Sequence, residues 1–257
     1  HPYGINLIGE YNVTGDMWQY THLLEEIGIK IVTTLAGDGR LEDIQTAHRA
    51  KLNVLVCAKS LVTMARKMEE KYNIPYVSVS FYGKRDTTNA IMTIVEAFQD
   101  ESLTAKAKEV IQREEAKLEV KLEPFRDILK GKKAILNTGG NKSWSIASAL
   151  QDIGLEVVAT SIAKTTLEDI EIAKKYVPIL MKSPANEQSK LIDEHKVDIL
   201  LAGGRSLYTA IKKKISFVDV NQEKKVSYGA YDGLTNLAID VVNSLQNRVF
   251  KVVATKA

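Results

Sequence analysis

The only cysteine of the chain lies where an apolar run meets an amphipathic stretch. The run "NVLVCA" (53–58) is rich in β-branched residues and predicts a strand, whereas residues 60–72 predict a helix. Cys57 therefore lies at a strand-to-helix turn, close to Lys59. A helix N-terminus and a nearby ammonium group both favour the thiolate, which is the form of cysteine that binds metal. The alternative role is that of a small buried hydrophobic residue, which is common for an isolated cysteine.

Two glycine pairs follow other predicted strands. One segment reads "TGGNKS" and includes Gly139, Gly140 and Lys142, and the other reads "GGRS" and includes Gly204. A glycine pair after a strand permits a tight turn, and its bare backbone lets an anionic ligand approach the N–H groups. Neither segment has the spacing of a dinucleotide fingerprint or of a P-loop. The residues alone therefore indicate a cleft that suits an anionic ligand, with a thiol available as an anchor.

The elements that must position these residues alternate along most of the chain. Strands are expected in the first half at 5–11, 30–35, 53–58 and 75–80, and in the second half at 132–140, 156–162, 179–183, 197–204 and 216–220. Helices are expected between them, the first at 15–27, 41–50 and 60–72. This alternation predicts the α/β class, with two Rossmann-like parallel-sheet domains that carry helices on both faces.

A helical connector is expected between the two sheets. Residues 86–130 are mostly helical in pattern and carry alternating charges, which favours a solvated connecting helix. The expected domains are residues 1–130, which include the connector, and residues 131–257, which end in a helix over about 233–250. Because ligands bind at the carboxyl ends of parallel strands, Cys57 and both glycine pairs are expected to border one cleft.

Composition excludes several classes of function. The chain has 35 basic and 32 acidic side chains and a net charge of +3, too mild a balance to indicate nucleic acid. No apolar run approaches the roughly 20 residues that a membrane span requires, so no membrane partner is expected. A single cysteine excludes an internal disulfide framework, as well as a multi-cysteine metal site made by this chain alone, and indicates a cytoplasmic setting.

Longer segments of the sequence resemble nitrogenase component 1. They are "INLIGEYNVTGDMWQ", "TAHRAKLNVLVCAKSLVTMARKMEEKYNIPY", "FYG", "GKKAILNTGGNKSWSIASALQDIGLEVVAT" and "DILLAGGRSLYTAIKKKISFVDVNQE". Within that family they are most similar to the α-type subunit of the scaffold on which the iron–molybdenum cofactor is assembled. The similarity covers nearly the whole chain and corresponds to the second and third α/β domains of the family. The chain, which begins with "HPYG", is therefore expected to be a segment of a longer protein whose N-terminal domain is absent here.

The resemblance implies roles for the residues singled out above. In catalytic relatives, the cysteine that matches Cys57 binds the terminal iron of the molybdenum–iron–sulfur cofactor. Gly139, Gly140 and Lys142 match a turn and a cation that contact the sulfides of the cluster. The full set of positions that the resemblance places around the cofactor, besides Cys57, is Lys59, Ser60, Gly139, Gly140, Lys142 and Gly204.

One departure from the catalytic pattern is informative. Catalytic subunits carry a histidine in a closing "YHGYDG" motif that binds the molybdenum end of the cofactor, and this chain has Gly229 in "SYGAYDG" instead. A site with one protein ligand suits the receipt and release of a precursor, which favours an assembly scaffold over a turnover enzyme. The variant Gly229→His is accordingly expected to hold mature cofactor more tightly, provided that the backbone tolerates the side chain.

The resemblance also implies cargo and partners. The whole protein would receive an iron–sulfur precursor, host its maturation with molybdenum and homocitrate, and release it to nitrogenase. Expected partners are a β-type scaffold subunit in an α2β2 assembly, the nitrogenase iron protein and the precursor-forming enzyme. The cysteines of the family's interfacial cluster lie outside this chain, so this segment is expected to lack that cluster and to be empty of precursor. Two alternatives remain open, namely a catalytic nitrogenase-like reductase subunit and a small-molecule-binding α/β protein with a structural cysteine.

Overall fold

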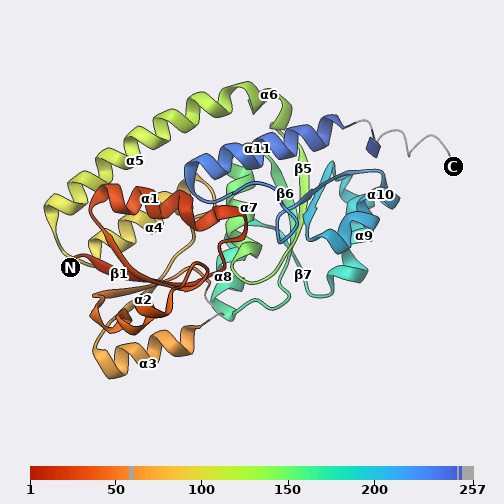
Figure 1. Ribbon diagram of the computed structural model, residues 1–257. Helices are drawn as coiled ribbons and strands as arrows, with labels where there is room; N and C mark the ends of the chain where they lie inside the picture. The colour runs from red at the N-terminus through yellow and green to blue at the C-terminus, as the bar shows by residue number, and fades with distance from the viewer. Residues whose placement is uncertain (58–60, 248, 251–257) are drawn as a thin grey trace.

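Two parallel sheets surrounded by helices form the framework of the protein (Figure 1). The structure is a computed structural model that describes residues 1–57, 61–247 and 249–250. Over these residues, a 4-stranded sheet has the order β2-β1-β3-β4 and a 5-stranded sheet has the order β7-β6-β5-β8-β9. Neighbouring strands within each sheet pair in parallel. The predicted α/β class, with two parallel sheets, is confirmed.

The elements follow the predicted alternation closely. Those of the first half are β1 (Gly4–Glu10), α1 (Asp16–Ile27), β2 (Lys30–Ala36), α2 (Leu41–Gln45), β3 (Leu52–Leu55), α3 (Val62–Tyr72) and β4 (Tyr76–Ser78). The connector consists of α4 (Lys84–Glu96), α5 (Glu101–Leu122) and α6 (Arg126–Leu129). Those of the second half are β5 (Lys133–Asn137), α7 (Lys142–Asp152), β6 (Glu156–Ser161), α8 (Leu167–Tyr176), β7 (Ile179–Met181), α9 (Pro184–His195), β8 (Ile199–Ala202), α10 (Leu207–Lys213), β9 (Ser216–Asp219) and α11 (Ala230–Gln246).

The inner strands are buried on both faces. All four residues of β3 and of β8 are buried, as are six of the seven in β1. Successive side chains point to opposite faces, so Ile5 and Leu7 join one hydrophobic cluster while Ile8 joins another beneath α3. This two-sided burial explains why these strands appear in the sequence as continuous apolar runs.

One hydrophobic cluster joins the two halves of the molecule. It contains residues of both sheets and of α1, α4, α5, α7 and α11. Helices α5 and α11 run side by side along the top in Figure 1, and α11 also packs against α1, α4 and β9. The closing helix therefore returns to the first half. We retain 1–130 and 131–257 as the proposed domains, a division that separates the sheets although they share a core.

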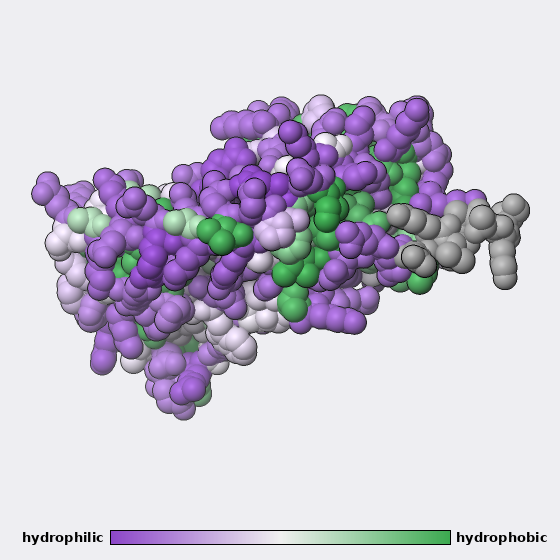
Figure 2. Space-filling model, turned by 90° about the horizontal axis from the view of Figure 1, so that it is seen from above, coloured by the Kyte–Doolittle hydropathy of each residue, from purple (hydrophilic) through white to green (hydrophobic). Residues whose placement is uncertain are grey.

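The upper surface of the molecule is largely hydrophilic (Figure 2). Hydrophobic residues gather in a narrower zone toward the middle of this face. Helix α5 has 22 residues, which is long enough to cross a bilayer, but charged side chains occur along its whole length. Among the described residues, no helix combines the length and the apolar character that a membrane span requires.

The strand orders determine where ligands can bind. In the first sheet, the connections from β1 and from β3 leave in opposite directions, and β5 and β8 stand in the same relation in the second sheet. Open parallel sheets bind ligands outside the carboxyl ends of the strands at such a switch point. Glu10 and Cys57 lie at or just after the ends of β1 and β3, while Gly139 and Gly203 follow β5 and β8. Both switch points therefore supply residues of the site described next.

Candidate functional site

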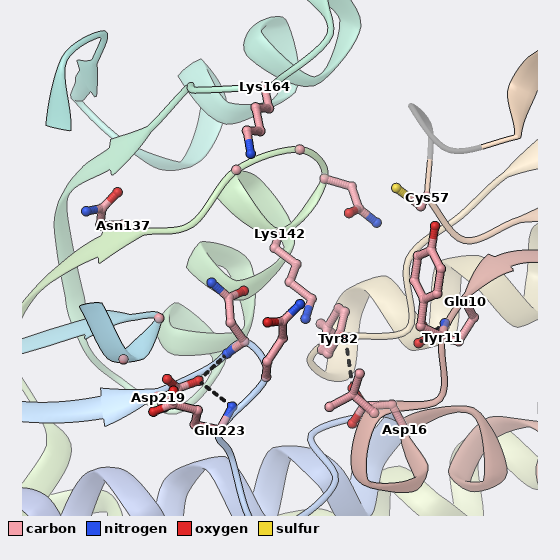
Figure 3. A pocket seen from close by; sticks show the side chains of 18 of the residues that line it. Glu10, Tyr11, Asp16, Cys57, Tyr82, Asn137, Lys142, Lys164, Asp219 and Glu223 are labelled. Carbon is pink, nitrogen blue, oxygen red and sulfur yellow. Dashed lines mark hydrogen bonds between the residues drawn. The ribbon is translucent and has the colours of Figure 1, made fainter. Parts of the chain in front are cut away.

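A cavity of about 710 Å³ lies between the carboxyl ends of the two sheets. Its volume falls within the range of about 300–1,000 Å³ that is typical of small-molecule and cofactor sites. Segments that follow β1, β3, β4, β5, β6, β8 and β9 all contribute to its lining (Figure 3). The main polar and ionisable side chains of the lining are Glu10, Tyr11, Asp16, Cys57, Tyr82, Asn137, Asn141, Lys142, Lys164, Arg205, Ser206, Asp219, Asn221, Gln222 and Glu223.

The structure brings together the described residues that the sequence singled out. Cys57, Gly139, Gly140, Lys142 and Gly204 all line this cavity. The two remaining candidates, Lys59 and Ser60, lie outside the described residues.

Cys57 lies close to the glycine turn of the second sheet. Strand β3 ends at Leu55, so the cysteine occupies the loop that leaves the strand, where it is half-buried as a free thiol. The side-chain amide of Asn141 donates a hydrogen bond of 2.5 Å to the carbonyl oxygen of Val56, the residue before Cys57. In Figure 3 the sulfur points across the cavity toward the loop between Asn137 and Lys142. The thiol and the turn therefore face one another from different sheets.

Close packing requires glycine at position 139, and backbone conformation favours glycine at position 140. A Cβ atom at Gly139 would lie 2.3 Å from the carbonyl oxygen of Ala163, so only glycine fits there. Gly140 has φ +62°, which disfavours other residues, although a Cβ atom there would meet nothing within 4 Å. A Cβ atom at Gly204 would lie 2.3 Å from a carboxylate oxygen of Glu223. Open space beside Gly140 leaves this part of the turn accessible to a ligand.

In the described part of the cavity lining, the cationic side chains are those of Lys142, Lys164 and Arg205. The ammonium group of Lys142 lies 5.4 Å from the centre of the Tyr82 ring and donates to the carbonyl oxygen of Val220 at 3.5 Å. These contacts hold the charge at the boundary between the halves. The side chain of Lys164 points toward the glycine turn (Figure 3). Lys142 and Lys164 therefore place positive charge beside the glycine turn, which Cys57 faces.

A buried network around Asp16 forms one wall of the cavity. One carboxylate oxygen of Asp16 forms an ion pair with Lys224, whose side chain is fully buried, and accepts a hydrogen bond of 3.0 Å from Tyr82. The other oxygen accepts from the backbone N–H groups of Tyr228 at 2.7 Å and Gly229 at 3.2 Å. Burial lowers the pKa of Lys224, and the neighbouring Asp16 opposes that shift. The network ties the start of α1 to the segment that precedes α11.

Glu10 adds a second carboxyl group to the same wall. Its Oε1 atom accepts hydrogen bonds of 2.9 Å from the backbone N–H groups of Tyr11 and Asn12. Burial raises the pKa of Glu10, and the negative charge of Asp16 raises it further, whereas these N–H groups and Lys142 lower it.

The structure corrects the expectation for Gly229. A Cβ atom at this position would lie 2.4 Å from the backbone carbonyl oxygen of Asp16, so no larger side chain fits without movement of the backbone. Gly229 also pairs with Tyr82 in an isolated bridge, and its N–H group donates to Asp16. The condition attached to the Gly229→His expectation, a backbone that tolerates the side chain, is therefore not met, because the position faces packed protein.

Several lining residues were missed in the sequence. Asp16 follows the first strand and Lys164 follows "EVVATSI", so reading beyond every strand end would have found these two. Glu10 is the last residue of β1 and lies within the strand expected over 5–11. Asp219 ends β9 and accepts backbone hydrogen bonds within its own loop, where Asn221 N donates at 2.7 Å. Tyr82 has the same signal, because it follows the strand expected at 75–80, which is β4 in the structure.

The arrangement matches a known family. Residues 1–246 match the family model described as nitrogenase component 1 type oxidoreductase. The chain belongs to the nitrogenase component 1 family. Over the described residues, its fold is similar to the structure titled "Nitrogenase Cp1 at pH 6.5", with a TM-score of 0.86 at 23% sequence identity over 97% of this chain and 59% of that chain.

Curated relatives within the family carry a more specific name. The chain is 44% identical over 260 residues to "Nitrogenase iron-molybdenum cofactor biosynthesis protein NifE" of Nostoc sp., which covers 100% of this chain and 54% of the relative. It is 38% identical over 257 residues to the protein of the same name from Klebsiella pneumoniae, covering 98% of this chain and 56% of the relative. The chain therefore spans about half the length of the curated relatives it matches.

Proposed function

We propose that this chain is the cofactor-holding part of a scaffold on which the nitrogenase iron–molybdenum cofactor is assembled. Its cargo would be an iron–sulfur precursor that is anchored by the thiolate of Cys57, matured with molybdenum and homocitrate, and then released to nitrogenase. The observation that carries this proposal is that Cys57, Gly139, Gly140, Lys142 and Gly204 line one cavity. The names of the curated relatives support the same function.

The chemistry of the cavity fits an anionic cluster. A thiolate is the ordinary protein ligand of iron in iron–sulfur clusters. The ammonium group of Lys142 favours the negative charge of the cargo, and the open side of Gly140 allows sulfides to approach the backbone. Burial within a cavity strengthens each of these charge interactions relative to water.

The donor set favours temporary holding over permanent binding. The described lining of the cavity contains one cysteine and no histidine, and Gly229 is packed against Asp16. Among the residues that the structure describes, no group of three or more histidine, cysteine or carboxylate side chains could hold a metal ion. A cluster held through one thiolate can leave when a single bond breaks. This supports a scaffold in preference to a catalytic reductase subunit.

The proposed partners are those that such a scaffold requires. They are a β-type scaffold subunit in an α2β2 assembly, the nitrogenase iron protein and the enzyme that forms the precursor. The interfacial cluster of the family would be held by cysteines outside this chain. The cavity would therefore hold its cargo fully only in the assembled protein.

Truncation of the thiol tests the proposal. In the protein paired with its β-type partner, Cys57→Ala is expected to lose precursor iron from this cavity while the interfacial cluster remains. Cys57→Ser should retain an intermediate amount, because its oxygen is a weaker ligand for iron. Ser102→Ala is the control, since Ser102 is exposed at the start of α5 and lies outside the cavity.

Iron analysis and a transfer assay to cofactor-free nitrogenase provide the measurements. We expect both precursor iron and transferred activity to fall together in Cys57→Ala and to stay unchanged in the control. Unchanged precursor iron in Cys57→Ala would remove the thiolate from the mechanism and would favour an α/β binding protein with a structural cysteine.

A further inference from the structure

The side chain of Asn141 makes a hydrogen bond that links the two halves of the molecule. The proposed function assigns no role to this hydrogen bond. Asn141 immediately precedes α7, a position where an asparagine side chain often caps the helix. Here it makes no capping hydrogen bond, and its own backbone is already helical, with φ −62° and ψ −27°. Its amide donates instead to the carbonyl oxygen of Val56 at 2.5 Å. The bond links residues that are 85 positions apart.

The two ends of this bond are both firmly anchored. The backbone N–H of Val56 donates to the carbonyl oxygen of Ile8 at 2.9 Å, and the Val56 side chain is buried. On the other side, Gly139 is packed against the carbonyl oxygen of Ala163, which fixes the turn on the second sheet. The Asn141 amide therefore joins a segment packed on the first sheet to one packed on the second, and both Val56 and Asn141 line the cavity.

Cys57 directly follows Val56, whose carbonyl oxygen accepts this hydrogen bond. Strand β3 ends at Leu55, so the ladder of the sheet no longer holds the cysteine directly. The carbonyl of Val56 lies in the peptide unit that leads into Cys57, and a hydrogen bond to it restricts the rotation of that unit. Placement of a ligand atom by neighbouring hydrogen bonds is a general requirement of sites that bind metal precisely.

We propose that Asn141 is a positioning residue that sets where the Cys57 thiol lies relative to the Gly139–Gly140 turn. Its function is to hold the peptide unit between Val56 and Cys57 against the turn before any cargo arrives, so that the thiolate is already in place when the cluster binds. This inference deepens the proposed function and depends on it for the identity of the cargo. The position of the thiol itself can be measured without cargo.

The single cysteine makes the test direct. Cys57 is the only cysteine of this chain, and peptide mapping by mass spectrometry separates its alkylation from that of any cysteine elsewhere in the assembled protein. The probe is iodoacetamide, and the measurement is its second-order rate constant with the purified protein at fixed pH. Asn141→Leu removes the donor while keeping the approximate size, and Asn141→Asp replaces the donor with an acceptor that repels the carbonyl oxygen. Asn141→Gln keeps an amide donor on a longer side chain.

Loss of the donor should expose the thiol. A hydrogen bond of ordinary net strength shifts a local opening equilibrium by roughly three- to tenfold, so both Asn141→Leu and Asn141→Asp should be alkylated faster by about that factor. Asn141→Gln should restore much of the slower rate. The matched control is Asn236→Leu, which removes a 3.0 Å amide bond to the carbonyl oxygen of Ser227 and should leave the rate unchanged.

The outcomes separate this inference from the proposed function. Alkylation rates that stay at the original value in both Asn141→Leu and Asn141→Asp would overturn the positioning role, whatever the cargo. Equal acceleration in Asn236→Leu would also overturn it, since a general loosening would then explain the effect. Precursor retention that is unchanged in Cys57→Ala would refute the proposed function but would leave the alkylation result standing.

Discussion

Replacement of Asp86 by asparagine is expected to stabilise the protein increasingly as the pH rises. Asp86 lies on α4 where that helix packs against α7, and it is 6% exposed. One of its oxygen atoms, Oδ2, has no hydrogen-bond partner among the described residues. Burial, with a contribution from the charge of Asp152, raises the pKa of Asp86 to about 7, although Ser148 and Arg85 oppose the shift.

The sign and the size of the change in the free energy of unfolding follow from this shift in the pKa of Asp86. The folded protein holds a proton on Asp86 up to a pH of about 7, whereas the unfolded chain loses it near the ordinary pKa of 3.8. The unfolded state therefore binds fewer protons between these values, and the free energy of unfolding falls as the pH rises from about 4 to about 7. Each pH unit within this window costs at most about 1.4 kcal/mol. Between pH 5 and pH 8 the total loss is roughly 2–3 kcal/mol.

Asparagine has nearly the same shape but no charge to bury. The variant Asp86→Asn should therefore lack this loss, and its stability relative to the original protein should grow by roughly 2–3 kcal/mol from pH 5 to pH 8. Urea denaturation at each integral pH, followed by circular dichroism, measures the difference. Asp43→Asn is the control, because Asp43 is exposed and its removal should give no such pH-dependent gain.

Subtracting the free energy of unfolding of the original protein from that of Asp86→Asn at each pH removes the pH dependence that both proteins share. If the stability curves of Asp86→Asn and of the original protein run parallel from pH 5 to pH 8, then Asp86 does not titrate in this range when folded. Burial between α4 and α7 would then not be the cause of any pH sensitivity of the protein.

Three further predictions concern the walls of the cavity. Gly229→Ala should lower the free energy of unfolding by about 2–3 kcal/mol, because its Cβ atom would lie 2.4 Å from the Asp16 carbonyl oxygen, and an unchanged melting temperature would contradict this. Lys224→Met should cost about 3–5 kcal/mol by leaving Asp16 buried without its cation, and the double variant with Asp16→Asn should recover much of the loss in a double-mutant cycle. Gly140→Ala should cost only about 1–2 kcal/mol, since its φ of +62° is unfavourable but the space is open, and denaturant titration would show whether the loss is larger.

The sequence was most informative where a strand is buried on both faces. The apolar runs at β1, β3 and β8 predicted strands that the structure contains, because each inner strand of a parallel sheet needs apolar side chains on both sides. Ends of elements were less accurate. The helix expected over 41–50 divides into α2, which ends at Gln45, and a 3-10 turn over Ala47–Arg49, since local periodicity does not show where a chain must bend.

The same reasoning placed a large part of the candidate site. Residues that directly follow parallel strands reach the same edge of a sheet, so Cys57, Gly139, Lys142 and Gly204 could be assigned to one cleft from their spacing. The rule works because the sheet itself orders the loops at its carboxyl edge. It would have found Asp16 and Lys164 as well, had the segments after the strands at 5–11 and 156–162 been treated in the same way.

Sequence alone therefore determined the α/β class, the two parallel sheets and the loops that meet at the cavity, because those features depend on local periodicity and on chain order. The tertiary structure alone decided how the halves are joined. Asp16 and Lys224 are 208 residues apart, and nothing in their surroundings predicts a buried ion pair. The same packing places the Asp16 carbonyl where any side chain at position 229 would need space. Such contacts depend on the relative positions of elements that are distant in the chain, and burial excludes the water that would otherwise satisfy these polar groups.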